Sequence, residues 1–415
     1  MYKALVLLYS FPPFHLNSSL RTFNYLRNFK NSNWEISLIT STPFDVELDS
    51  TEFLKHGIRI SELTVIPNKH KNLNNFTTFK ANFQHFVNTL FYIPDTVSSW
   101  AKKAAKKVDD MFKYNNYDVL YISVPPFSLF NEFAYLKKKY DIPLIVDYFE
   151  NWSDNYNNLT PTIFHKSLHK KYEYNSLKIV DKIIVPNRKM KEHLLNKYPF
   201  LTFDDILILS NSYFDKDFIH LAPIESSKLK ILHPGSVFSK FDYFPFLQAV
   251  SEIASNNLSF ANHLEIHFAT PLRSNIKKKI QNLNITSLIY EHNLNSLEEF
   301  NQLVVNSDII FISMPDIKGI DLLTPPLVYH LFGSKKPFLA AIPDGVLKND
   351  LEKYNACYFA EIDNIPSIKK ELLQIYEDYK NKKLAKVNYE FLHQFDASII
   401  TEELIKLFHF YLPYL

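Results

Sequence analysis

Two cationic side chains in the second half of the chain follow predicted strands, where they could hold an anion. Lys240 lies in the loop after the predicted strand over residues 229–234, and Arg273 follows the next predicted strand. Opposite charge in a closed site stabilises a departing anion such as a diphosphate. Gly235 and Ser236 share the loop of Lys240, and a glycine lets the backbone come close to a ligand. A single Lys or Arg is more often a surface charge, so the residues alone leave both interpretations open.

The stretch from Gly319 to Pro337 is the most distinctive in the chain. A loop that contains Gly319 leads through Thr324 into a short predicted helix with prolines at its start. Such a start exposes backbone N–H groups in the manner of a phosphate site.

Polar residues also follow two predicted strands in the first half. His15 and Arg21 come after the first strand, at the start of a predicted helix whose N–H groups could bind an anion or a hydroxyl. Asp147, Glu150 and Trp152 end another strand, where carboxylates could accept hydrogen bonds from a sugar and the indole could pack on its ring. The alternatives are a capped helix with a solvated Arg21, and helix capping beside a half-buried Trp152.

The hydrophobic pattern supplies the elements that position these residues. Short apolar runs alternate with longer amphipathic segments, which is the signature of parallel α/β sheets. Strands are predicted near 3–10, 35–41, 58–66, 118–124, 143–148, 182–187, 206–211, 229–234, 264–270, 287–292, 308–314, 337–342 and 357–361. Helical spacing is found over 18–30, 127–140, 161–179, 244–256, 296–306, 365–381 and 397–411.

This alternation predicts an α/β fold with two Rossmann-like, doubly wound parallel-sheet domains. The first covers residues 1–211 and the second covers 228–396, with 212–227 as the linker. The pattern does not assign the closing segment 397–415 to a domain, and packing back on the first domain is one of its placements. Open α/β sheets bind ligands outside the carboxyl ends of their strands, so we expect the site in the cleft between the domains.

Composition excludes several classes of protein. The chain has 415 residues and only five glycines, so neither a G-x-G-x-x-G fingerprint nor a phosphate loop of the P-loop type can be written. A net charge of +2 gives no field that would favour nucleic acid. The single Cys357 excludes a disulfide framework and fits a reducing compartment. The apolar run at the N-terminus reads as a buried strand rather than a signal peptide.

In the segments above, the chain resembles glycosyltransferase family four, whose GT-B architecture places two Rossmann-like domains across a cleft. The likeness runs over nearly the whole chain, and its order and spacing carry the fold prediction. It comprises an F-P-P loop ending in Ser-x-Arg (Phe11 to Arg21), an I-P-D-x-x-x-x-W segment (Ile93 to Trp100), a D-L-R-D-P-W strand end (Asp147 to Trp152), an N-G-F-D turn (Asn211 to Phe214) and a P-x-K-L-Y-E-Y-L-A-x-x-K-P element (Pro325 to Pro337).

The resemblance implies transfer of a sugar from a nucleotide-diphosphate sugar, with retention of configuration and without a required protein nucleophile. The C-terminal domain would hold the donor, and the N-terminal domain would hold a glycan or lipid-linked acceptor. Lys240, Arg273 and the helix start near Thr324 would stabilise the leaving diphosphate. Glu150 or His15 would orient the acceptor or take up its proton. No metal or other cofactor is expected.

One departure from the family pattern is Phe149, which stands where the family has Arg, and the others fall on the donor side. The family's ribose-binding glutamate falls at His330, its lysine at Leu327 and its earlier glutamate at Leu322. A histidine can still exchange a hydrogen bond with a ribose hydroxyl, and Asp321 is the acid beside Leu322. The other candidate donor contacts are Gly235, Ser236, His292, Gly319 and Tyr329.

Two patterns suggest a metal, and in both the alternative is favoured. Residues 215–217 spell D-x-D, but they lie in the predicted linker and are interpreted as a turn. His165, His169 and Glu173 share one helical face at zinc-like spacing, yet the neighbouring lysines favour a solvated face.

Residues 69–115 carry eight Lys against three Asp and no Glu, interleaved with aromatic residues. Such a segment could seat the protein on an anionic membrane leaflet, where lipid-linked acceptors lie. Ordinary packing of a helix with a lysine face in water is the favoured alternative.

The leading hypothesis is a glycosyltransferase in the cytoplasm or at the inner face of the membrane. A second is a noncatalytic GT-B protein that binds a glycan or a partner, and a third is a nucleotide-sugar epimerase.

Overall fold

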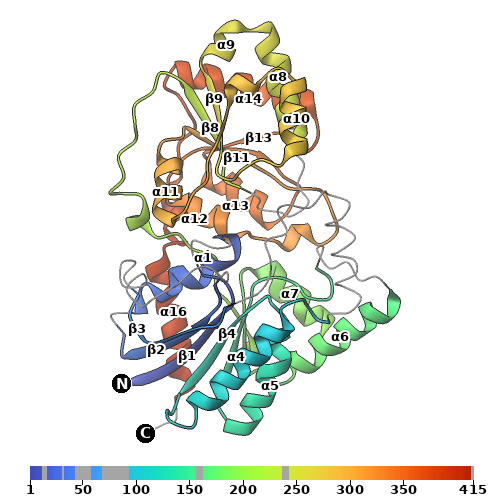
Figure 1. The fold of residues 1–415 in the computed structure, drawn as a ribbon, viewed down its shortest axis with the longest axis vertical. Helices are drawn as coiled ribbons and strands as arrows, with labels where there is room; N and C mark the ends of the chain where they lie inside the picture. The colour runs from blue at the N-terminus through green and yellow to red at the C-terminus, as the bar shows by residue number, and fades with distance from the viewer. Residues whose placement is uncertain are drawn as a thin grey trace. The chain divides into compact units, whose positions relative to one another are not determined.

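The computed structural model describes residues 1–11, 16–29, 32–42, 58–67, 93–155, 162–235 and 243–412. They form two compact units, one of Met1–Ser210 with Ala397–Leu415 and the other of Asn211–Asp396. Each unit holds one parallel sheet with helices packed on it (Figure 1). This confirms the predicted α/β class with two Rossmann-like parallel sheets.

The N-terminal unit has a seven-stranded sheet in the order β3-β2-β1-β4-β5-β6-β7. Its strands are β1 (Tyr2–Leu8), β2 (Trp34–Thr40), β3 (Ile60–Val65), β4 (Val119–Val124), β5 (Leu144–Tyr148), β6 (Lys182–Val185) and β7 (Ile206–Ile208). Its described helices are α1 (Leu16–Leu26), α4 (Ser98–Met111), α5 (Ser128–Tyr140), α6 (Ile163–Leu177), α7 (Arg188–Lys197) and α16 (Ala397–Phe410), with the short 3-10 helix η3 (Phe203–Asp205). The central strands β1, β4 and β5 are almost continuous apolar runs, as strands covered on both faces require.

The C-terminal unit has a six-stranded sheet in the order β10-β9-β8-β11-β12-β13. Its strands are β8 (Leu229–His233), β9 (Leu264–Phe268), β10 (Ile289–Glu291), β11 (Ile309–Ser313), β12 (Phe338–Ala341) and β13 (Cys357–Phe359). Its helices are α8 (Phe244–Asn256), α9 (Leu258–Asn262), α10 (Ser274–Asn282), α11 (Leu297–Val305), α12 (Pro326–Phe332), α13 (Val346–Tyr354), α14 (Ile365–Lys380) and α15 (Tyr389–His393). The 3-10 helices are η4 (Asp215–Asp217), η5 (Thr286–Leu288) and η6 (Ile320–Leu322).

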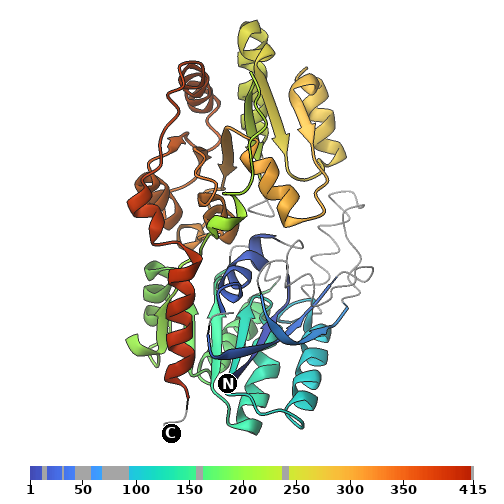
Figure 2. The same cartoon turned by 90° about the vertical axis from the view of Figure 1, so that its left-hand side faces the viewer.

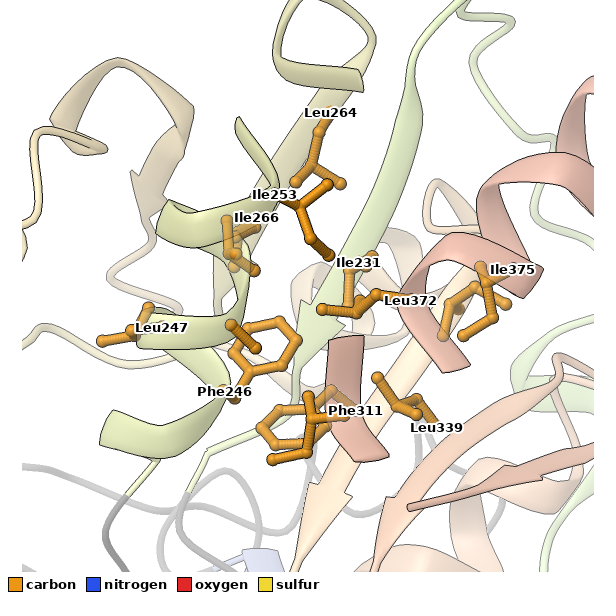
Figure 3. Close-up of a cluster of buried hydrophobic side chains, with 14 of the residues drawn as sticks. Ile231, Phe246, Leu247, Ile253, Leu264, Ile266, Phe311, Leu339, Leu372 and Ile375 are labelled. Atoms are coloured by element: carbon orange, nitrogen blue, oxygen red, sulfur yellow. The ribbon is translucent and has the colours of Figure 1, made fainter. Parts of the chain in front are cut away.

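A single apolar cluster holds α8 and α14 on the sheet of this unit (Figure 3). Ile231 of β8 and Phe311 of β11 come from the centre of the sheet, and Phe246 of α8 stacks on Phe311 with ring centroids 4.1 Å apart. Leu372 and Ile375 of α14 close the cluster. The strand ends beyond it are therefore carried on a rigid support.

Helix α16 belongs to the N-terminal unit although it closes the chain (Figure 2). Phe408 packs edge-on against Trp34 at 5.3 Å, and the indole of Trp34 donates a hydrogen bond to His409 at 3.2 Å. Thr401 donates to the carbonyl of Tyr25 in α1. These contacts make α16 part of the core around β2 and α1.

None of the described helices combines the length and the apolar character that a membrane crossing requires.

Candidate functional site

The strand order of the C-terminal unit indicates where a ligand would bind within it. The chain runs outward from β8 through β9 to β10, and then returns to the other side of β8 with β11. Ligands of such sheets bind at this reversal, outside the carboxyl ends of the two central strands. Gly235 lies there, two residues after the end of β8. Its φ of 103° is a conformation that favours glycine, and a Cβ on it would lie 3.3 Å from Thr270.

His233 ends β8 at the same place and was not singled out from the sequence. Its ring is buried against Tyr243, Phe268 and Phe311, with centroids 5.2 to 6.0 Å away. Burial lowers its pKa to about 4, so the ring is neutral at pH 7. The N–H of Gly235 donates to its Nδ1 at 3.3 Å, which leaves the ring proton on Nε2. A neutral histidine at a strand end is therefore a second polar feature of this site.

The predicted cations are placed only in part. Lys240 and Ser236 lie outside the described residues. Arg273 is exposed and precedes α10, so it stands at the carboxyl end of β9, the strand beside β8. His292 follows β10 and exchanges a hydrogen bond of 3.0 Å with His267, and burial lowers the pKa of both rings.

The loop from Gly319 to Thr324 is held by a close backbone approach. Gly319 has a φ of 85° and precedes η6, which contains Asp321. A Cβ on Gly345 would lie 2.8 Å from the Cα and the carbonyl oxygen of Asp321. Because Gly345 immediately precedes α13, this approach fixes Asp321 beside the start of that helix. Thr324 is buried, and its carbonyl accepts a hydrogen bond from Asn211 at 2.6 Å.

Tyr329 and His330 of α12 face the interior of the unit. The Tyr329 hydroxyl donates to Asp350 of α13. His330 is fully buried, with Nε2 2.8 Å from Oδ1 of Asn301 and Nδ1 3.9 Å from the carboxylate of Asp217. Both rings thus hold α12 to its neighbours, and a ribose contact by His330 would require the ring to leave this setting.

Asp217 belongs to the D-x-D sequence, which forms the 3-10 turn η4. Asp215 pairs with Lys335 at 3.2 Å. Across the described ranges, no three His, Cys, Asp or Glu side chains gather as a metal site.

In the N-terminal unit, a buried ion pair joins α1 to the central sheet. Nε of Arg21 donates to both carboxylate oxygens of Asp147, at 3.0 and 2.9 Å, and its Nη2 donates to the carbonyl of Leu209. Tyr121 of β4 donates to the same carboxylate. Both side chains of the pair are fully buried. Arg21 is therefore neither at the rim of an anion site nor solvated, and both predictions for it are wrong. His15 lies outside the described residues.

The segment after β5 carries Glu150. Its side chain accepts a hydrogen bond from Asn155 at 3.2 Å, and burial raises the pKa of its carboxyl group. Trp152 is completely buried and stacks on Phe127 with ring centroids 4.8 Å apart. The indole therefore has no face for a sugar, and the prediction that it packs on one is wrong.

The same segment is anchored by buried groups on α6 and α7. Glu173 of α6 accepts from the N–H of Ser153 and from Lys197 of α7, both at 3.1 Å, and from the hydroxyl of Tyr148. The ring of His169 accepts from the indole of Trp152 at 3.0 Å. The prediction of a solvated face is wrong for these two residues, because they support the segment that positions Glu150.

No family model matches the chain, and no curated protein matches its sequence. Three solved structures are similar over nearly the full length. A glycosyltransferase from Rickettsia africae has a TM-score of 0.64 at 14% identity, with 99% of this chain and 98% of that chain covered. Sucrose-phosphate synthase from Thermosynechococcus elongatus has a TM-score of 0.67 at 9% identity, with 99% and 98% covered. Anabaena HepE in complex with UDP and glucose has a TM-score of 0.64 at 10% identity, with 99% and 100% covered.

UDP-N-acetylglucosamine 2-epimerases are also similar, with TM-scores between 0.56 and 0.59. Two parallel sheets with the strand order of Rossmann-like domains, together with this likeness along the whole chain, identify the fold as GT-B.

Proposed function

We propose that the protein transfers a sugar from a nucleotide-diphosphate sugar to a hydroxyl acceptor. The observation that carries this proposal is at the carboxyl end of β8, where the strand order of the C-terminal sheet reverses. Gly235 there lets the backbone come close to a ligand, and the neutral His233 lies beside it. The GT-B structures similar to this chain include one in complex with UDP and glucose, which makes UDP the first nucleotide to try.

In this proposal, the C-terminal unit binds the donor. Arg273 and Lys240 neutralise the diphosphate as it leaves, and the loop from Gly319 to Thr324 contacts the sugar or the ribose. Transfer proceeds with retention and needs neither a metal nor another cofactor.

The N-terminal unit binds a glycan or lipid-linked acceptor. Glu150 is the better candidate there for orienting the hydroxyl and taking up its proton, because burial raises its pKa toward the range in which a general base works well. We place the reaction in the cytoplasm or at the inner face of a membrane, since the single Cys357 fits a reducing compartment.

The second candidate is a noncatalytic GT-B protein. It is favoured by two positions of α12 at which the resembled family has charged residues. This chain has the buried Leu327 at one of them and His330, which lies inside the unit, at the other. A third, the epimerase, shares the fold of the similar structures at lower TM-scores.

A thermal-shift panel of UDP, GDP, ADP, CMP and their sugars tests the proposal. We expect one nucleotide to raise the melting temperature, and both Lys240→Ala and Arg273→Ala to abolish that rise. Lys278→Ala is the matched control, because Lys278 is an exposed cation on α10, five residues after Arg273. Silence across the whole panel would favour the noncatalytic candidate. If a nucleotide does bind, hydrolysis of its bound sugar derivative to free nucleotide and sugar would separate a transferase from a binding protein.

A further inference from the structure

The first turn of α6 exposes two large apolar side chains next to each other. Ile163 is 89% exposed and Phe164 is 70% exposed. They lie at the beginning of the helix, and their neighbours in the first turn do not cover them. Leaving both in water costs hydration free energy that a second surface would recover.

Lysines follow the two apolar residues along the same helix. Lys166, Lys170 and Lys171 are all exposed, and the only acidic residue of α6, Glu173, is buried inside the unit. Helical side chains lean toward the N-terminus of their helix, so the three ammonium groups are directed toward the turn of Ile163 and Phe164. The exposed face of α6 therefore carries two apolar side chains in its first turn and three lysines in the turns that follow.

The opposite face of α6 is fixed. His169, Glu173, Ser176 and Leu177 are buried, and Glu173 is held by Ser153 and Lys197. The helix lies at the edge of the N-terminal unit (Figure 1). Ile163 and Phe164 thus lie on a helix that is held in place from its other face, and they are exposed without any change of fold.

We propose that this face of α6, from Ile163 to Lys171, docks on an anionic lipid surface. Apolar side chains at the level of the headgroups, backed by lysines, are the combination that such a surface binds. The complementary charge is the reason to prefer a membrane over a second copy of the chain, which would bring the three lysines against the same three lysines.

The inference deepens the proposed function and rests on it only for the acceptor. Glu150 and α6 lie on the same connection, since α6 is the helix that follows β5. Docking through α6 would bring the segment of Glu150 near the headgroup layer, where a lipid-linked acceptor presents its hydroxyl. It differs from the predicted contact through residues 69–115. In the described part of that segment, α4 buries Trp100 and Val108 and packs against α5.

Vesicle flotation tests the inference with the full-length protein. We expect binding to vesicles of phosphatidylcholine with phosphatidylglycerol at low salt, weaker binding at high salt, and none to phosphatidylcholine alone. Replacing Lys166, Lys170 and Lys171 with Gln should lower the partition coefficient about 100-fold, since each lysine near an anionic leaflet contributes about fivefold. The double change Ile163→Ser and Phe164→Ser should lower it about tenfold or more.

Two controls keep the outcome decisive. Leu258→Ser removes an apolar side chain that is 77% exposed on the other unit, and it should leave flotation unchanged. Gln in place of Lys102, Lys103 and Lys106 on α4 removes the same charge from the segment predicted from sequence. Loss of flotation in the α4 variant but not in the α6 variants would overturn the inference. Failure of the wild-type protein to bind the anionic vesicles would overturn it as well.

Light scattering tests the remaining alternative, in which a second copy of the chain binds this face of α6. A dimer of the wild type that disappears with Phe164→Ser would assign the surface to a second copy and would also overturn the proposal. Each variant's melting temperature is compared with that of the wild type, and the changed side chains are exposed, so folding should be unaffected. Nucleotide binding in the thermal-shift panel is measured separately, so failure of the proposed function and failure of the docking surface can be told apart.

Discussion

The ion pair between Arg21 and Asp147 gives the sharpest stability prediction. Asp147→Asn keeps the shape of the side chain but removes its charge, which leaves a fully buried guanidinium without its counter-ion. Breaking one partner of such a pair costs about 3–5 kcal/mol. A domain of roughly 150–250 residues loses about 2–4 °C per kcal/mol, so we expect a drop of about 6–20 °C in melting temperature.

The chain provides a reporter for this unit alone. Its three tryptophans, Trp34, Trp100 and Trp152, all lie in the N-terminal unit. Tryptophan fluorescence during urea unfolding therefore follows the unit that contains the ion pair. Circular dichroism of the same samples follows both units, so a second transition that keeps its urea midpoint in circular dichroism shows that the C-terminal unit is unaffected.

Asp110→Asn is the matched control, because Asp110 of α4 lies in the same unit and pairs with Lys113, and the two side chains are 47% and 54% exposed. A pair this exposed is screened, and we expect little change in the free energy of unfolding. The double change Arg21→Met and Asp147→Leu should recover much of the lost stability, since no charge is then left buried. A cost for Asp147→Asn as small as that of Asp110→Asn would refute the reasoning.

Three further predictions concern the strand ends. The pKa of His233 in the folded chain, about 4, lies below the ordinary 6.5, so the unfolded chain takes up a proton first as the pH falls. The free energy of unfolding of the C-terminal unit should therefore decrease as the pH falls from 6.5 to 4. Urea midpoints from circular dichroism at pH 7 and 5 should show this dependence in the wild type and a weaker one in His233→Phe. Gly345→Ala places a Cβ 2.8 Å from the backbone of Asp321, so it should lower the free energy of unfolding by about 1–3 kcal/mol. It should also reduce the nucleotide-induced thermal shift, and an unchanged shift would show that Asp321 is not part of the donor site. Glu150→Gln should lower transfer about 100-fold and abolish the fall in activity at acid pH while nucleotide binding stays intact, and equal activity of Gln and Glu would exclude the base role.

The strands could be predicted from the sequence because each is a short apolar run between turn residues. The thirteen predicted strands correspond to β1 through β13, with ends that differ by a few residues. Burial on both faces leaves little room for another interpretation of such runs. Helices α7, α10 and α13 were not among the predicted segments, because they span only nine or ten residues, too few for the helical period to stand out.

The side chains at the strand ends were harder to predict for a physical reason. Arg21 and Asp147 are separated by 126 residues, and no local pattern shows that each neutralises the other. His169 and Glu173 sit between lysines, so the helix reads as solvated, although Trp152 and Ser153 bond to both from the preceding segment. Burial of a polar residue depends on a partner elsewhere in the chain, and a single sequence does not show that partner. His233 was missed for the related reason that its aromatic surroundings come from three other elements.

The chain crosses between the units twice, and this has a consequence for biosynthesis. Helix α16 belongs to the core of the N-terminal unit, but it is translated after all of Asn211–Asp396. At roughly 5–20 residues per second, the first unit must wait about 10–40 s for its last helix. During that interval, while the C-terminal unit is being translated, the surface of Trp34 and α1 that α16 covers is open to chaperones. A fragment ending at Ser210 would keep this surface exposed, so the C-terminal unit is the better one to express alone.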